Sequence, residues 1–200
     1  MIAEGSLIFL VDFEASSLNS GSFPVEVAWV DANGHGEAYL IRPPQKWIDG
    51  GGWSRESEAM HGISLDTLLK DGVPVELVAK RAADALSSEG AVACSDQPAF
   101  DGFWMRLLLD AGGEKRTVRL LELHQVYACA CRPLLDRLVG LDGAARKQAV
   151  QALQSDAARI IARAQEAEAR RPRVRHRALA DAESLWRVWR AVRKQVGRCS

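Results

Sequence analysis

The sequence lacks the features that mark membrane proteins and secreted proteins. No stretch approaches the roughly 20 consecutive apolar residues that a bilayer-spanning helix needs. The first residues, Met-Ile-Ala-Glu-Gly-Ser, do not form a basic segment followed by a long apolar run. Low-complexity segments and internal repeats are also absent. We therefore expect a soluble protein located in the cytoplasm.

Cysteine is scarce and is not arranged as a metal site. The chain has four cysteines, and they do not form two Cys-x-x-Cys pairs: Cys94, Cys129, Cys131 and Cys199. A structural zinc site is therefore not expected. We expect reduced thiols, with Cys94 on a buried strand.

A net charge is absent as well, but the zero conceals a gradient along the chain. Residues 159–200 hold 12 Lys and Arg against 4 Asp and Glu, a balance of +8, so residues 1–158 hold 14 against 22, a balance of −8. An acidic part could hold metal ions while a basic part contacts a polyanion. Solvent-exposed helix faces would explain the late arginines equally well.

What is present is a chain of 200 residues with the apolar and charged content, 48% and 26%, of an ordinary globular protein. Strands are predicted at 6–14, 23–30, 37–42, 91–94 and 117–121. Helices are predicted at 55–60, 65–70, 74–87, 98–111, 144–170 and 178–196, and residues 45–53 are predicted to be a glycine-rich loop. An Asn-Gly pair at 33–34 favours a hairpin between the second and third strands. The order predicts an α/β fold with a mixed five-stranded sheet, antiparallel at first and then parallel, flanked by helices.

The first strand ends in two carboxylates. Its residues 7–11 are all apolar, as in a strand that is buried on both faces. Asp12 and Glu14 are two residues apart, so their side chains project from the same face. Two like charges side by side cost free energy that a bound cation would relieve. A strand that simply ends in water would explain the same pair without a cation.

Two further acidic positions stand out later in the chain. Asp101 falls in the first turn of the predicted helix 98–111, and Asp181 falls in the first turn of the last one. His176 precedes Asp181 by five residues, a rotation of about 500° on a helix, so we expect His176 in the preceding loop. Taken singly, first-turn aspartates are explained by capping or by the helix dipole.

Together, these residues resemble the motifs of the DEDDh 3′–5′ exonuclease family, which includes proofreading exonuclease subunits, ribonuclease T and oligoribonuclease. The motifs are Asp-x-Glu at 12–14, Phe-Asp at 100–101 and His-x-x-x-x-Asp at 176–181. The stretch 23–30 resembles the family's second strand, and Met-His-Gly-Ile-Ser at 60–64 resembles its His-Gly-Ile turn, in which His61 is structural. The resemblance implies a ribonuclease H-like fold in a single exonuclease domain over residues 1–200, with a helical insertion at about 129–170.

The resemblance also implies a function, the hydrolysis of phosphodiester bonds at the 3′ end of single-stranded nucleic acid with release of nucleoside 5′-monophosphates. Four carboxylates would hold two divalent ions, Mg²⁺ or in its place Mn²⁺: Asp12, Glu14, Asp101 and Asp181. The two ions would stabilise the attacking and leaving oxygens. His176 would take a proton from the attacking water.

Several substrate contacts follow from the same resemblance. Ser16 is expected to offer a hydroxyl to the terminal sugar, and Leu18 stands where relatives place an apolar wedge against the terminal bases. Arg173 and Arg175 belong to a run of five arginines at 170–177 and are expected to contact the strand. A solvated loop is the alternative for that run. Asp96 departs from the family's pattern and is expected to cap the following helix; as an extra carboxylate close to the metals it could instead tune their affinity.

The sequence leaves other choices open. It does not separate RNA from DNA. Residues 144–170 could form a homodimer interface or pack within the molecule. Two rival functions also fit: a non-catalytic nucleic-acid-binding or polymerase-associated module with an exonuclease fold, and an endonuclease or phosphodiesterase of very short oligonucleotides.

Overall fold

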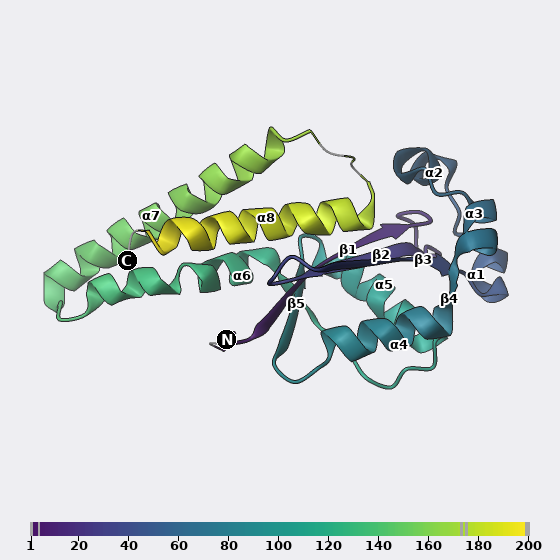
Figure 1. Cartoon of the computed structure of the whole chain (residues 1–200), viewed down its shortest axis with the longest axis horizontal. Helices are drawn as coiled ribbons and strands as arrows, with labels where there is room; N and C mark the ends of the chain where they lie inside the picture. The colour runs from purple at the N-terminus through teal and green to yellow at the C-terminus, as the bar shows by residue number, and fades with distance from the viewer. Residues whose placement is uncertain (1, 4, 173, 175, 199–200) are drawn as a thin grey trace.

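The computed structural model describes residues 2–3, 5–172, 174 and 176–198, and shows a mixed sheet between two groups of helices (Figure 1). The sheet has six strands in the order β4-β3-β2-β1-β5-β6. β2 pairs antiparallel with β1 and β3, while β5 pairs parallel with β1 and β6, and β4 parallel with β3. The strand bounds are Leu7–Ala15 (β1), Pro24–Asp31 (β2), Gly36–Arg42 (β3), Val73–Pro74 (β4), Ala91–Ser95 (β5) and Leu120–Glu122 (β6). The predicted α/β fold with an antiparallel and then parallel sheet is confirmed.

The number of strands was predicted wrongly, because β4 was not anticipated. This strand is only two residues long and pairs with Ile41 and Arg42 at the sheet edge. Pro74, predicted to lie inside a helix, is instead the last strand residue and the residue before α4 (Val75–Leu86). Proline lacks the N–H that a central strand would need, so an edge position suits it.

The helices follow the predicted order, with two additional helices and a 3₁₀ segment that falls in the helical insertion expected at about 129–170. They are α1 (Gln45–Asp49), α2 (Arg55–His61), α3 (Leu65–Asp71), α4, α5 (Pro98–Ala111), α6 (Leu123–Ala130), the 3₁₀ segment η1 (Arg132–Leu138), α7 (Gly143–Ala169) and α8 (Ala178–Val196). α1 lies in the segment predicted to be a loop. Its Trp47 is buried and stacks on Phe23, with ring centroids 5.6 Å apart. This contact favours a helical turn that the glycine-rich composition of the segment did not suggest.

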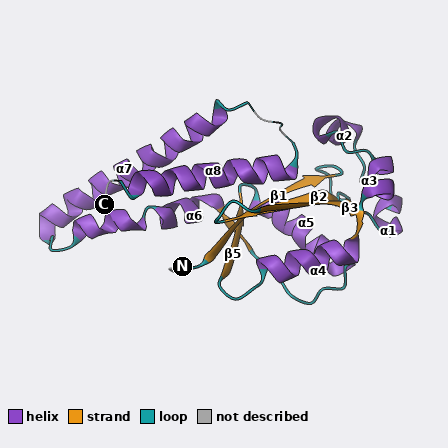
Figure 2. Ribbon diagram, in the orientation of Figure 1, coloured by secondary structure: helices purple, strands orange, loops and turns teal. Residues whose placement is uncertain are grey.

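The strand β1 is buried on both faces, which explains its unbroken apolar run. Val11 and Phe13 pack into the core that the sheet shares with α4 and α5. Ile8 and Leu10 pack into a second core beneath α6, α7 and α8. Figure 2 shows these two helical groups on opposite sides of the strands. The carboxylates that end β1 therefore sit between the two helical layers.

The long helix α7 packs within the molecule. It runs alongside α8, and its apolar face meets the second core through Leu153, Ala157, Ile160, Ile161 and Ala164. On the same core, Trp189 is buried and Trp186 partly buried. Among the helices of the described residues, none combines the length and the apolar character needed to cross a membrane.

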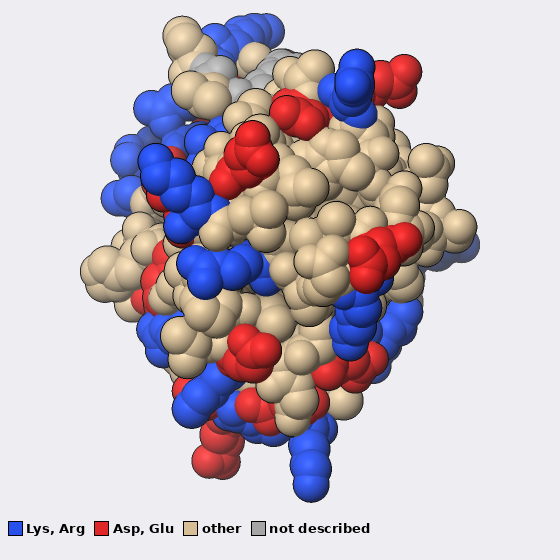
Figure 3. All heavy atoms as spheres, turned by 90° about the vertical axis from the view of Figure 1, so that its right-hand side faces the viewer, with Lys and Arg blue, Asp and Glu red and all other residues tan. Residues whose placement is uncertain are grey.

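Several of the arginines in the later part of the sequence are already paired with carboxylates of the protein. Arg177 pairs with Glu26, Arg187 with Glu168, and Arg159 with Asp156. On the face shown in Figure 3, acidic and basic side chains are interspersed. That face is therefore not a uniformly basic surface for a polyanion.

Candidate active site

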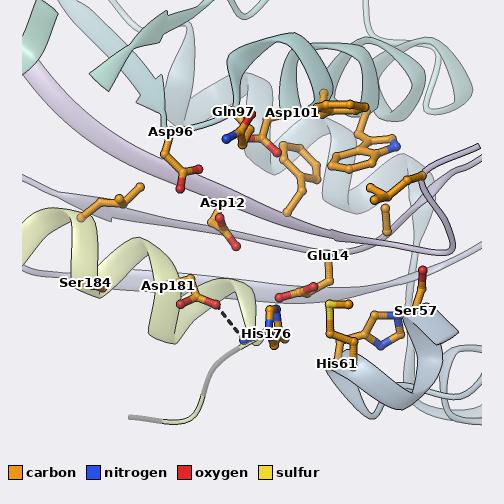
Figure 4. A pocket seen from close by; sticks show the side chains of 17 residues that line it. Asp12, Glu14, Ser57, His61, Asp96, Gln97, Asp101, His176, Asp181 and Ser184 are labelled. Carbon is orange, nitrogen blue, oxygen red and sulfur yellow. Dashed lines mark hydrogen bonds between the residues drawn. The ribbon is translucent and has the colours of Figure 1, made fainter. Parts of the chain in front are cut away.

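A pocket of about 510 Å³ collects the carboxylates that the sequence singled out. It lies where β1 ends, between the first turns of α5 and α8 and the helix α2. All five residues predicted to be catalytic line it: Asp12, Glu14, Asp101, His176 and Asp181. Figure 4 shows their side chains converging from β1, α5 and the start of α8.

Asp12 and Glu14 enter the pocket from the same face of β1, as their spacing predicts. Burial raises the pKa of Asp12 well above its ordinary value, and the negative charges of Asp101 and Glu14 raise it further. Burial, followed by the negative charge of Asp181, raises the pKa of Glu14 to about 8. These carboxyl groups are therefore held where their ionised forms are costly.

Asp101 is more deeply buried than its first-turn position on α5 requires. Its side chain is 3% exposed, and its Oδ2 atom has no hydrogen-bond partner in the described part of the chain. Burial raises its pKa to about 7. The Ser95 hydroxyl and the backbone N–H of Gln97 partly offset this rise in pKa, but Oδ2 stays without a partner and can accept another ligand.

The residue at the N-cap of α5 is Gln97 rather than Asp96, and Pro98 opens the helix. Asp96 lines the pocket, and its negative charge raises the pKa of Asp12 and of Asp101. The expectation that Asp96 is the helix cap is therefore wrong. The residue adds a fifth carboxylate to the pocket.

His176 lies in the loop before α8, and Asp181 in the first turn of that helix, as predicted. The backbone N–H of His176 donates to Oδ2 of Asp181 at 2.8 Å (Figure 4). One ligand atom each from Glu14, His176 and Asp181 lies within 4.8 Å of the others. The loop thus brings the imidazole beside two carboxylates.

These residues fit a hard divalent cation. The donors are carboxylate oxygens, which Mg²⁺ and Mn²⁺ prefer. Asp101 offers an oxygen without another partner in the described residues. The ionised form of Asp12 is destabilised by the charges of Asp101 and Glu14, and that of Glu14 by the charge of Asp181. A bound cation would satisfy the orphaned oxygen and offset that repulsion.

Comparisons with known proteins agree at the level of the fold. No family model and no curated protein matches the sequence. Among solved structures, the zinc-bound complex of Escherichia coli exonuclease I with single-stranded DNA matches with a TM-score of 0.64 at 14% identity, covering 96% of this chain and 41% of that one. Exonuclease I of Methylocaldum szegediense matches with a TM-score of 0.61 at 16% identity, again over 96% of this chain and 41% of that one. The chain has the exonuclease I fold. It spans well under half the length of those proteins.

Exposed apolar side chains form a rim around the carboxylates of the pocket. Leu18 lines the pocket and is 73% exposed. Met60 and Phe100 also line it and are large exposed apolar side chains. Sequence reasoning did not single out either residue as part of the pocket, although each stands next to a motif residue, His61 or Asp101.

Ser16 does not face the pocket, contrary to expectation. It is fully buried; its hydroxyl donates to the carbonyl oxygen of Gly52 at 2.8 Å and accepts from the N–H of Phe23 at 3.0 Å. The hydroxyl already donates one hydrogen bond and accepts another within the protein. Ser16 therefore holds the turn after β1 instead of contacting substrate.

His61 has the structural role that the turn implied. Its Nδ1 accepts from the N–H of Ile63 at 3.0 Å, which fixes the His-Gly-Ile turn after α2. Arg173 and Arg175, expected to contact the strand, lie outside the described residues.

Proposed function

We propose that the chain is a metal-dependent 3′–5′ exonuclease that acts on single-stranded DNA and releases nucleoside 5′-monophosphates. One observation carries the proposal. Three segments far apart in the sequence bring five carboxylates and a histidine into a single pocket. The fold around that pocket is shared with exonuclease I structures that contain single-stranded DNA.

The ions proposed for the site are Mg²⁺, with Mn²⁺ as a substitute, held by Asp12, Glu14, Asp101 and Asp181. When bound, such ions supply charge stabilisation for the attacking and leaving oxygens of a displacement at phosphorus. The protein holds these four carboxylates together in one pocket from which water is partly excluded. Asp101 is buried and Asp12 is partly buried, so little water competes with the ions for these oxygens.

The proposed base is His176. Its ring lies beside Glu14 and Asp181 at the edge of the pocket, and the residue is exposed. An imidazole in this position can take a proton from a water molecule in the pocket and pass it to solvent. The two carboxylates beside the ring balance the positive charge that it gains.

The apolar rim explains a preference for single strands. Leu18, Met60 and Phe100 are exposed apolar side chains at the pocket. Unpaired bases have free faces that can pack on such side chains, whereas paired and stacked bases do not. A 3′ end would therefore be held by its bases at the rim and by its phosphate at the carboxylate site.

The test is cleavage of 5′-labelled single-stranded DNA and RNA in Mg²⁺, in Mn²⁺ and in EDTA. The proposal expects a ladder that shortens from the 3′ end of DNA with either metal and disappears in EDTA. Binding of the oligonucleotide without any cleavage would instead indicate a non-catalytic module. Internal cuts, or cleavage confined to very short oligonucleotides, would indicate the endonuclease or phosphodiesterase alternative.

A further inference from the structure

A buried glutamate next to the carboxylate pocket has no part in the proposed metal site. Glu26 lies on β2 directly opposite Glu14 of β1 and is 3% exposed. Like charges at directly opposite positions of a sheet are destabilising, and burial makes the ionised form more costly. A second glutamate here therefore needs a compensating partner.

The compensating groups come from Arg177 and Ala178, at the start of α8. The carboxylate of Glu26 accepts from Nε of Arg177 at 3.1 Å, from Nη2 of the same residue at 2.7 Å, and from the backbone N–H of Ala178 at 2.9 Å. Ala178 is the first residue of α8, and the preceding Arg177 makes no side-chain cap of its own. Glu26 thus caps the helix from a strand 151 residues earlier in the chain, at the end where the helix dipole favours a negative charge.

The segment that Glu26 anchors carries the proposed base. His176 has φ 58°, the only non-glycine residue of the described chain in the left-handed region. A histidine pays a conformational cost there, so the conformation persists only where its surroundings fix it. On one side, the N–H of His176 is bonded to Asp181. On the other side, the next two residues are bonded to Glu26.

We infer that Glu26 is a positioning residue, whose carboxylate holds residues 176–178 so that the imidazole of His176 faces Glu14 and Asp181. The inference rests on the proposed exonuclease function. The guanidinium of Arg177 links Glu26 to this segment and places a positive charge near the carboxylates. Without the link, residue 176 would leave its left-handed conformation and the imidazole would move away from the water that it is to deprotonate.

The chain offers a matched control elsewhere. Glu37 of β3 receives two guanidinium bonds from Arg81 of α4, the same strand-to-helix pairing of the same residue types. Neither residue lines the carboxylate pocket. Glu37→Gln therefore loses an Arg–Glu ion pair, with a glutamate side chain 32% exposed against 4% for that of Glu26, without touching the segment that carries His176.

The first experiment measures kcat and KM on single-stranded DNA for the wild type, Glu26→Gln, Arg177→Ala, the double variant and Glu37→Gln. We expect Glu26→Gln to lower kcat by about 10- to 100-fold, since a small misplacement of a catalytic group costs that much. KM should stay within about threefold, because the apolar rim is unchanged. The double variant should be no slower than the worse single variant, since both break the same link. Glu37→Gln should keep kcat within about twofold.

If Glu26 only stabilised the fold, the values of kcat would follow a different pattern. An unchanged kcat in Glu26→Gln, or a loss no larger than that of Glu37→Gln, would overturn the inference. If Glu26→Gln does not fold, Arg177→Ala serves instead, because that side chain is 45% exposed and its removal leaves the Ala178 bond in place.

The second experiment needs no activity. Amide hydrogen exchange is followed in peptides that cover 176–182, without added metal. Glu26→Gln should exchange at least about tenfold faster there than the wild type, while Glu37→Gln should match it. Unchanged exchange in Glu26→Gln would overturn the inference even in an active enzyme. Should the wild type cleave nothing, the proposed function fails, and the exchange result still decides whether Glu26 holds this segment.

Discussion

Replacing Asp101 by asparagine should stabilise the metal-free protein, although it removes a residue of the proposed site. The side chain is 3% exposed, and one of its oxygens has no hydrogen-bond partner in the described part of the chain. Burial raises its pKa to about 7, against about 3.9 in an unfolded chain. Asparagine keeps the shape of the side chain and carries no charge.

The sign and size of the effect follow from proton linkage. Between pH 4 and pH 7 the folded protein keeps a proton on Asp101 that the unfolded chain has lost, so the free energy of unfolding falls as pH rises. A gap of about three pH units corresponds to at most about 4 kcal/mol. Part of this is shared with the neighbouring carboxyl groups, so we expect a gain of about 2 kcal/mol at pH 8 for the variant. That gain should raise Tm by about 4–8 °C and should vanish near pH 4.

The assay is thermal and urea unfolding followed by circular dichroism, in EDTA, from pH 4 to pH 8. Asp110→Asn is the control, because Asp110 is exposed on the same helix and its replacement should change the free energy of unfolding by less than about 0.5 kcal/mol. Added Mg²⁺ or Mn²⁺ should stabilise the wild type and have little effect on Asp101→Asn. A variant less stable than the wild type at pH 8, or a gain that does not depend on pH, would refute the reasoning.

Three further substitutions separate catalytic from structural roles. Asp12→Asn should lower kcat by about 1,000-fold or more and abolish Mn²⁺ binding in calorimetry, since the carboxylate at the centre of the site is lost; retained binding would contradict its assignment as a ligand. His176→Asn should lower kcat by about 100- to 10,000-fold while leaving Tm nearly unchanged, because asparagine tolerates φ 58° but cannot act as a base. Ser16→Ala should lower the free energy of unfolding by about 1–3 kcal/mol, measured by urea unfolding, because two buried hydrogen bonds are lost. Its kcat should change less than about threefold, and a large loss of activity in a stable variant would restore the substrate role first expected for this hydroxyl.

The sequence predicted best those features that depend on residues close together in the chain. The apolar run of 7–11 and the alternation of Asp12 and Glu14 predicted both the buried strand and the face that the two carboxylates share. The predicted helix 98–111 matches α5, so the prediction that Asp101 lies in its first turn is confirmed. The five-residue spacing from His176 to Asp181 predicted a loop histidine beside a helical aspartate.

What the sequence did not reveal depends on partners far away in the chain. The hydroxyl of Ser16 was assigned to substrate because its bond to Gly52, 36 residues later, cannot be read from a neighbouring residue. The two-residue strand β4 exists only through its pairing with β3. Glu26 read as one more residue of a strand, since its bonds to Arg177 and Ala178 appear only after folding.

The most direct test of the central claim is the identity of the product formed in ¹⁸O-labelled water. A single-stranded DNA oligonucleotide with a free 3′ end is incubated with the protein and Mg²⁺, beside the same oligonucleotide blocked at its 3′ end and beside Asp12→Asn. The account predicts deoxynucleoside 5′-monophosphates that each carry one ¹⁸O, released only from the free 3′ end and only by the wild type. Internal fragments, 3′-phosphorylated nucleotides, equal release from the blocked strand, or no release at all would contradict it.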